Sequence, residues 1–175
     1  RIVEELHELL PQAGFIAEEG SANYSDEEYC WVIDPLDGTT NFIHDIAPYC
    51  VSIALRNREE ILIGVVYEVC RNELYWTYKG SKSYLNGKEI KVSDRKPEDA
   101  INEFGCGSTH KEHLEENWTI GGIIFENCMD IRRTCCASLA LCYIACGRIE
   151  GYFEKILKPW DIAAGTLILK EAGGI

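Results

Sequence analysis

The feature of this sequence that most limits its fold is a series of strand-like segments between residues 48 and 92. Residues 49–55, 61–69 and 73–78 are strand-like, and short polar turns separate them. Asn86-Gly87 then lies between two further apolar pairs, which is a strong signal for a β-hairpin with a type I′ turn. Because successive hairpins place neighbouring strands side by side, this region predicts an antiparallel sheet.

Helical and strand patterns alternate outside this sheet. Helices are predicted over residues 2–10 from their apolar spacing and over 109–118 from a polar helical pattern. Two more are predicted over 136–146, which is apolar nearly all round, and over 159–172, with Pro159 near the start and Gly173 just past the end. Short apolar runs predict strands over residues 15–17, 29–33, 123–125, 129–132 and 149–153. We therefore expect an N-terminal α+β part, residues 1–97, and an α/β part, residues 98–175. The chain begins without Met inside a helical pattern and stops where we expect a helix to end and a strand to begin, so we expect a fragment of a longer protein, truncated at its C-terminus.

Composition excludes several classes of protein. A hydrophobic content of 46% is enough for a sizeable core, and no apolar run is long enough to span a membrane. A net charge of −12 argues against a broad nucleic-acid-binding surface. The nine cysteines include no C-x-x-C pair, so a structural zinc site is not supported. We expect buried, reduced thiols in a cytoplasmic protein.

Residues 34–42, DPLDGTTNF, concentrate acidic and small polar side chains at the end of an apolar strand. Pro35 keeps Asp34 extended, and Gly38 allows a tight turn, so Asp34 and Asp37 can face one space. Two ionised carboxylates about 4 Å apart repel by roughly 4 kcal/mol at an effective dielectric constant near 20. Such a pair needs a proton or a cation, and oxygen ligands of this kind suit Mg²⁺.

Two more acidic positions have similar settings. Glu18 and Glu19 follow the strand over residues 15–17, and Asp161 lies in the first turn of the last helix. Taken alone, Asp161 is better explained as a favourable partner of the helix dipole than as a metal ligand. Asp34 and Asp37 alone are also compatible with a structural Asp-Pro turn.

The three motifs together resemble the inositol monophosphatase family of lithium-sensitive, magnesium-dependent phosphatases. The resemblance rests on residues 15–19, residues 34–42 and residues 159–165, with Arg132-Arg133 and residues 151–154 in the same order. The amino acids at residues 132–139 and 158–161 are more similar to those of bacterial members of the family than to those of animal members. The fold that the resemblance implies is a layered αβαβα sandwich of the sugar-phosphatase type, with the antiparallel sheet followed by a smaller mixed sheet.

The resemblance also implies a set of site residues. Mg²⁺ would be bound, as two or three ions with Mn²⁺ as a substitute, by Glu18, Asp34, the Leu36 carbonyl, Asp37 and Asp161. The catalytic residues would be Asp37 and the pair Thr39 and Glu18, which orient the attacking water. Substrate would meet backbone N–H groups of Gly38 and Thr39 at its phosphate, and Ala137, Glu154 and Asp161 near its hydroxyls. Glu19 would support the metal ligands from outside.

The function implied is magnesium-dependent hydrolysis of a small sugar-alcohol phosphate monoester, with myo-inositol monophosphate as the first expected substrate. Related enzymes acting on fructose 1,6-bisphosphate, histidinol phosphate or a nucleotide phosphate are the enzymatic alternatives. An alternative of another class is a regulatory, partner-binding protein with a vestigial metal site. The partner expected is a small phosphate-bearing molecule, not a membrane or nucleic acid, and a homodimer is common in the family.

One departure from the family pattern lies at Cys135-Cys136, where the family usually has Gly followed by Ser or Thr. These residues begin the helix over residues 136–146, beside the expected substrate pocket. A side chain added there puts the substrate in doubt, but not the metal chemistry, and introduces a thiol that oxidation can modify.

Overall fold

The computed structural model describes residues 1–18, 27–105 and 111–175. Glu19, predicted as a supporting acid, lies outside these described residues. Within them, no helix combines the length and the apolar character that a bilayer crossing requires. Every cysteine that the structure describes is a free thiol. Cys30, Cys50, Cys136 and Cys142 are buried as predicted, whereas Cys70 and Cys135 are exposed.

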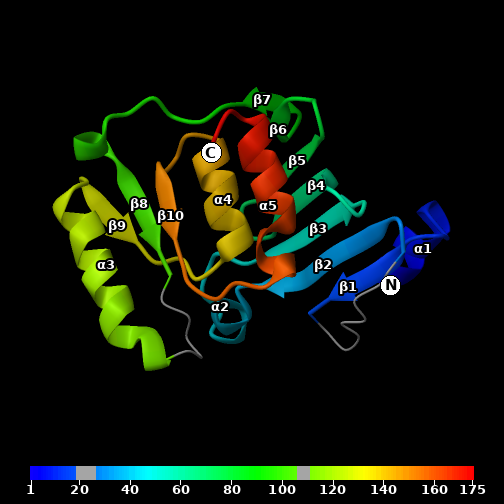
Figure 1. Cartoon of the computed structure of the whole chain (residues 1–175), viewed down its shortest axis with the longest axis horizontal. Helices are drawn as coiled ribbons and strands as arrows, with labels where there is room; N and C mark the ends of the chain where they lie inside the picture. The colour runs from blue at the N-terminus through cyan, green and yellow to red at the C-terminus, as the bar shows by residue number, and fades with distance from the viewer. Residues whose placement is uncertain (19–26, 106–110) are drawn as a thin grey trace.

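The large sheet has seven strands in sequence order (Figure 1). They are β1 (Gly14–Ala17), β2 (Cys30–Asp37), β3 (Cys50–Arg56), β4 (Ile61–Glu68), β5 (Glu73–Tyr78), β6 (Ser83–Leu85) and β7 (Lys88–Ile90). All neighbours pair antiparallel except β1 and β2, which are parallel. Asn86 and Gly87 have φ values of 47° and 78°, so the positive values of a type I′ turn join β6 to β7 as predicted.

The second sheet contains β8 (Ile101–Phe104) between β10 (Gly151–Phe153) and β9 (Asp130–Arg132). Both pairings are parallel, whereas a mixed sheet was predicted. The physical reason is the connections, because α3 (Leu114–Glu126) and α4 (Ala137–Ala145) each provide the crossover that parallel strands need. The strand predicted over residues 123–125 is wrong, since these residues lie in α3. A short apolar run does not by itself distinguish a helix from a strand.

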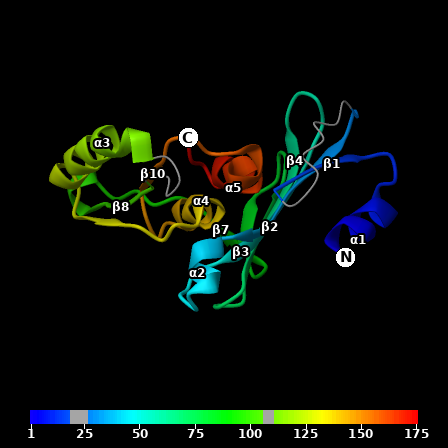
Figure 2. The ribbon, with the colours of Figure 1, turned by 90° about the horizontal axis from the view of Figure 1, so that it is seen from below.

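The elements form the predicted αβαβα layers, as Figure 2 shows. Helix α1 (Ile2–Leu9) packs on one face of the large sheet, where Trp31 and Ile33 are buried. Helices α4 and α5 (Pro159–Glu171) cover the other face and separate it from the second sheet, with α3 outermost. Short helices α2 (Thr39–Ile43), η1 (Pro97–Asp99) and η2 (Lys111–His113) lie in the connections. The division between residues 97 and 98 stays a prediction.

Helix α5 lies unusually close to the large sheet. A Cβ atom added at Gly64 of β4 would be 2.7 Å from the carbonyl oxygen of Ala164 in α5. A Cβ at Gly165 would likewise lie 2.8 Å from the Cβ of Leu141 in α4. The absence of side chains at these two glycines lets α5 fit between β4 and α4, and this close fit brings the first turn of α5 to the end of β2.

Candidate active site

An irregularity in β2 turns Asp34 and Asp37 to the same face of the sheet. Asp34 lies opposite Ser52 of β3 and Asp37 lies opposite Cys50, so three residue steps in β2 match two in β3. Side chains alternate along a strand, and this extra residue therefore restores a common direction for both acids. Both are buried, with 2% of Asp34 and 9% of Asp37 exposed. Strand β2 thus extends four residues beyond the predicted end at residue 33.

Each of the three aspartates predicted to bind metal has one carboxylate oxygen held by a backbone N–H group. Leu36 N–H donates to Asp34 Oδ1 over 2.9 Å, and Ser138 N–H, in the first turn of α4, donates to Asp37 Oδ2 over 2.7 Å. Lys158 N–H donates to Asp161 Oδ2 over 2.6 Å at the start of α5. These bonds fix the carboxylates in orientation and leave the second oxygen of each outside the anchoring bond.

The four predicted acidic ligands influence one another electrostatically. Burial raises the pKa of Asp34 above its ordinary value, and the nearby charges of Asp37 and Glu18 raise it further. Burial also raises the pKa of Asp37, to about 6, against the lowering effect of the Ser138 N–H bond. Burial raises the pKa of Asp161, and the charge of Glu18 adds to it. The set therefore disfavours its own full ionisation, which a bound cation would relieve.

The four acids surround the site instead of closing on one point. Across residues 1–18, 27–105 and 111–175, no three of these carboxylates place their oxygens within 4.8 Å of one another. Glu18 is exposed just beyond β1, and its backbone N–H donates to the carbonyl of Ile33 over 3.2 Å. Glu18 therefore approaches Asp34 and Asp161 from the solvent side, while the aspartates approach from within.

A cavity of about 390 Å³ opens beside these acids. Six of the residues that line it were predicted as site residues: Asp37, Gly38, Thr39, Ala137, Glu154 and Asp161. The other six are Thr40, Asn41, Gly105, Arg133, Cys135 and Leu157. The cavity thus brings the predicted substrate contacts next to two of the predicted metal ligands. Asp34 and Leu36, both in β2, are not among these lining residues.

The turn at Gly38 shapes one wall of the cavity. Gly38 has a φ of 91°, and a Cβ atom there would lie 3.0 Å from the carbonyl oxygen of Pro48. Thr39 follows as the first residue of α2, and its hydroxyl donates to the Leu36 carbonyl over 2.9 Å. The amide of Asn41 donates to the carbonyls of Pro48 and Thr134 over 2.8 Å and 2.7 Å, which ties this wall to the segment before α4.

Glu154 also lines the cavity. The Tyr152 hydroxyl donates to its carboxylate. A Cβ atom at Gly105 would lie 2.0 Å from Glu154 Oε2, so glycine at this position leaves the space that the carboxylate occupies. Cys135 lines the same cavity with a φ of 58°, a value that glycine adopts readily. The departure noted in the sequence therefore does place a thiol at the pocket.

Sequence reasoning missed Ser138, Cys50, Arg133 and Leu157 as parts of this site. Ser138 contributes through its N–H bond to Asp37 and through its hydroxyl, which donates to the Asp161 carbonyl over 2.8 Å. A serine at the start of a helix is a usable signal, but the aspartate it contacts is 101 residues away. Arg133 is a cation at the cavity, and its motif was noted without a role.

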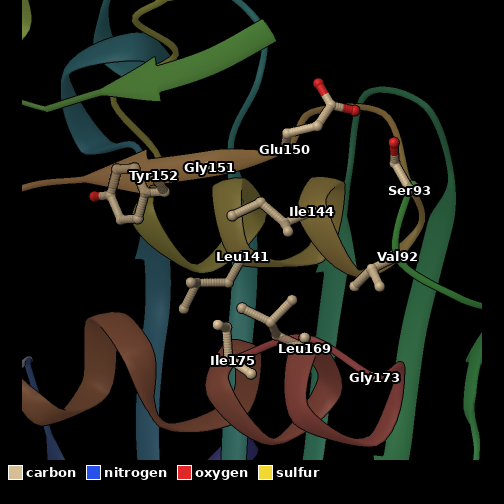
Figure 3. Close-up of a pocket in the computed structure, with 11 residues that line it drawn as sticks. Val92, Ser93, Leu141, Ile144, Glu150, Gly151, Tyr152, Leu169, Gly173 and Ile175 are labelled. Carbon is tan, nitrogen blue, oxygen red and sulfur yellow. The ribbon is translucent and has the colours of Figure 1, made fainter. Parts of the chain in front are cut away.

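A second hollow of about 450 Å³ lies between α4, β10 and the end of α5 (Figure 3). Its lining is mostly apolar and includes Leu141, Ile144 and Leu169. The one carboxylate in its lining, Glu150, accepts the N–H of Ile101 over 2.7 Å. This hollow therefore lacks the gathered acids that distinguish the first cavity.

The comparison with known proteins agrees with this geometry. The sequence model of the inositol monophosphatase family matches residues 1–175. The chain belongs to this family. It is 42% identical over 176 residues to the Nus factor SuhB of Escherichia coli strain K12, across 99% of this chain and 66% of that protein. The chain thus spans slightly less than two thirds of the length of this curated relative.

Two solved structures extend the likeness to the fold. The inositol monophosphatase from Anabaena (Nostoc) is 36% identical with a TM-score of 0.92, and the match covers 98% of this chain and 69% of that chain. A structure of SaIMPase-II with bound inositol monophosphate is 28% identical with a TM-score of 0.86, over 98% of this chain and 66% of that one. The layered fold is therefore that of the family.

Proposed function

We propose that the protein of which this chain forms part is a magnesium-dependent phosphatase that hydrolyses a small sugar-alcohol phosphate monoester, with inositol monophosphate as the first substrate to test. The observation that carries this proposal is the cavity where Asp37 and Asp161 meet Thr39, Ala137 and Glu154. Family membership and the ligand named in the structure of SaIMPase-II support it.

The donor set fits a hard divalent cation. Glu18, Asp34, Asp37 and Asp161 offer carboxylate oxygens, and the Leu36 carbonyl offers one more. Burial and mutual repulsion disfavour the ionised forms of the three aspartates, and a divalent cation removes that penalty. Because the four acids are spread around the site, we propose two or three Mg²⁺ ions, with Mn²⁺ as a substitute. Bound Mg²⁺ would supply charge stabilisation and a more acidic water.

The chain's own residues would position the reactants. The Thr39 hydroxyl donates a hydrogen bond to the Leu36 carbonyl, so its oxygen can accept a hydrogen bond from a water. Glu18, whose side chain is exposed, would orient the same water. Backbone N–H groups of Gly38 and Thr39 would meet the phosphate, with Arg133 as a nearby cation. Glu154 and Asp161 would accept hydrogen bonds from substrate hydroxyls beside Ala137, and Glu19 would support the metal ligands.

A second candidate is a regulatory, partner-binding role, because the Escherichia coli relative is named a Nus factor. This candidate and the phosphatase are separable, since a vestigial metal site would not need all four acidic residues to be kept. The other phosphate substrates named above, a homodimer and a cytoplasmic location also remain proposals.

The deciding experiment measures phosphate release by the full-length protein. Inositol, fructose, histidinol and nucleotide phosphates are each assayed with Mg²⁺, with Mn²⁺, with Mg²⁺ plus Li⁺, and with a chelator. We expect release from inositol monophosphate that needs Mg²⁺ and falls with Li⁺. Glu154→Gln should raise KM for inositol monophosphate, while Asp94→Asn, an exposed acid outside the cavity, serves as the control. Equal release with Mg²⁺ and with chelator would refute the proposal.

A further inference from the structure

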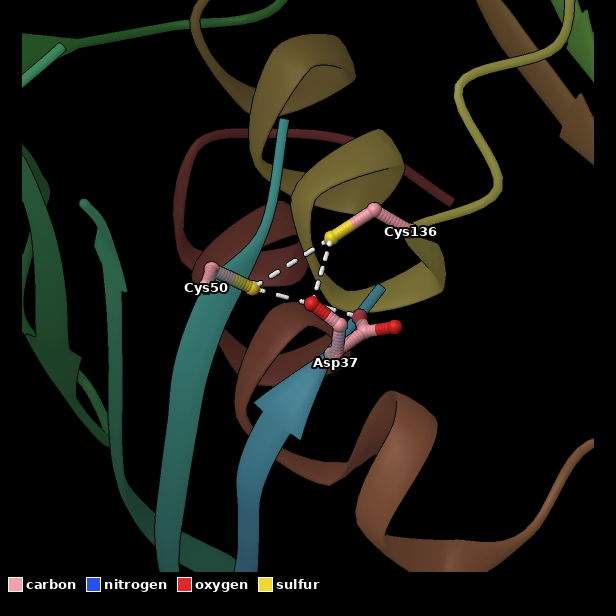
Figure 4. Close-up of side chains that lie close together, drawn as sticks. All are labelled: Asp37, Cys50 and Cys136. Carbon is pink, nitrogen blue, oxygen red and sulfur yellow. Dashed lines mark hydrogen bonds between the residues drawn. The ribbon is translucent and has the colours of Figure 1, made fainter. Parts of the chain in front are cut away.

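Three potential metal-binding atoms meet behind the acidic cavity, on three different elements (Figure 4). Cys50 begins β3, Cys136 directly precedes α4, and Asp37 ends β2. The two Sγ atoms are 3.5 Å apart, and Cys50 Sγ is 3.9 Å from Asp37 Oδ2. Among the residues that the structure describes, this is the one such group whose ligand atoms all lie within 4.8 Å of one another.

Two of the three separations in this group are close to those between ligands of a tetrahedral ion, and the third, from Cys136 Sγ to the Asp37 carboxylate, is within 4.8 Å. Zinc binds thiolate sulfur at about 2.3 Å and carboxylate oxygen at about 2.1 Å, which places neighbouring ligand atoms roughly 3.6–3.8 Å apart. The separations of 3.5 Å and 3.9 Å already lie close to these values. Small shifts of the side chains would therefore admit an ion, without movement of β3 or α4.

The surroundings of the group separate it from ordinary buried cysteines. Cys50 is 0% exposed and Cys136 is 1% exposed, so both could simply fill the core as small apolar residues. Cys142, which is also buried, fills the core in this way and is not part of the group. Cys50 and Cys136 instead face a carboxylate that lines a cavity. Asp37 therefore connects the two buried thiols to the cavity, although neither thiol lines it.

We propose that Asp37, Cys50 and Cys136 form a binding site for a thiophilic divalent cation of the zinc type. On binding, each thiol releases its proton to solvent as its sulfur bonds to the metal. Two thiolates and one carboxylate then carry three negative charges against the two positive charges of the cation, so the loaded site keeps one net negative charge. The C-x-x-C spacing of many structural zinc sites is absent because the two cysteines come from segments 86 residues apart.

This site shares Asp37 with the proposed Mg²⁺ site. A zinc-type ion would engage the side of the carboxylate that carries Oδ2, which faces Cys50 and the Ser138 N–H. Bound there, it would compete with Mg²⁺ for Asp37, and only this consequence rests on the proposed function. The existence of the site is tested without substrate, so its failure and a failure of the phosphatase proposal are distinguishable.

The test uses Co²⁺ as a spectroscopic probe of the reduced, full-length protein. Thiolate ligation in a tetrahedral site gives a sulfur-to-cobalt charge-transfer band and strong visible bands. We expect these bands in the wild type, and at least about tenfold weaker Co²⁺ affinity in Cys50→Ala and in Cys136→Ala. Cys142→Ala, a buried thiol of the same helix, and Cys135→Ala, an exposed thiol of the cavity, are matched controls that should keep wild-type affinity.

Several results would overturn the proposal. Bands that persist in Cys136→Ala, or that disappear in Cys135→Ala, would place the cobalt on other thiols. A Cys50–Cys136 disulfide in the unreduced protein, with no cobalt uptake after reduction, would make the pair a redox pair instead. If the two alanine variants fail to fold, X-ray absorption of the cobalt-loaded wild type decides: sulfur neighbours at about 2.3 Å support the site, and oxygen or nitrogen neighbours alone refute it.

Discussion

Replacing Asp37 by asparagine is expected to make the metal-free protein more stable at neutral pH while removing a proposed Mg²⁺ ligand. Asn has nearly the shape of Asp, and its carbonyl oxygen can still accept the Ser138 N–H bond, which spans 2.7 Å in the wild type. The substitution therefore removes the buried charge and keeps the anchoring contact between β2 and α4.

The pKa of Asp37 sets the size of the expected gain in stability. Burial raises it from 3.8 to about 6, so the folded protein holds this proton more tightly than the unfolded chain. The free energy of unfolding of the metal-free wild type consequently falls as the pH rises from about 4 to 6, and stays lower above that range. Since one pKa unit corresponds to about 1.4 kcal/mol, the loss is about 3 kcal/mol. Because Asn does not ionise, the free energy of unfolding of the variant does not fall in this pH range for this reason.

The assay is urea unfolding of the full-length protein in a chelator at pH 4 and pH 7.5, and again at pH 7.5 with Mg²⁺. Asp37→Asn should gain up to about 3 kcal/mol over the wild type at pH 7.5 without metal, and little at pH 4. With Mg²⁺, the wild type should gain stability and the variant much less. A variant that is less stable than the wild type in chelator at pH 7.5, or that responds equally to Mg²⁺, would refute the reasoning.

Three other substitutions test the packing and the site wall. Gly64→Ala places a Cβ 2.7 Å from the Ala164 carbonyl oxygen and should lower the free energy of unfolding by about 1–3 kcal/mol in urea. Cys135→Gly relieves a φ of 58° and should raise it by about 1 kcal/mol, and no gain would show that the turn is unstrained. Arg148 donates to both oxygens of Glu73 over 2.6 Å and 2.7 Å, and mainly for this reason the pKa of Glu73 falls to about 2. Stability from this pair is present above pH 4.5 and lost as the pH falls towards 2, so acid unfolding of Arg148→Met should lack that loss and its stability at pH 7 should be about 1–3 kcal/mol lower.

The sequence predicted most elements whose pattern is local. The strand expected over residues 61–69 is β4 (Ile61–Glu68), and the helix expected over residues 159–172 is α5 (Pro159–Glu171). Hairpin turns and helix ends depend on residues that are close in the sequence, and this is why they could be predicted. The apolar run over residues 123–125 was assigned wrongly because three residues do not distinguish the two periodicities.

The site was predicted in part, for a related reason. The acids of residues 34–42 belong to one motif, but their common direction depends on the irregular pairing of β2 with β3. The contact of Cys50 with Cys136 depends on how α4 packs against β3, and the sequence holds no local sign of it. The roles of the acids as metal ligands stay a prediction.

The backbone anchoring of the three aspartates has a consequence for the choice between ions. With Oδ1 of Asp34 held by Leu36, and Oδ2 of Asp37 and of Asp161 held by Ser138 and Lys158, each side chain can most easily offer a single oxygen. Calcium commonly takes both oxygens of a carboxylate and roughly 6–8 ligands in all, whereas magnesium accepts one oxygen from each and completes a compact octahedron with water. If the three aspartates bind metal as proposed, the three backbone N–H bonds would thereby favour magnesium over the larger calcium ion.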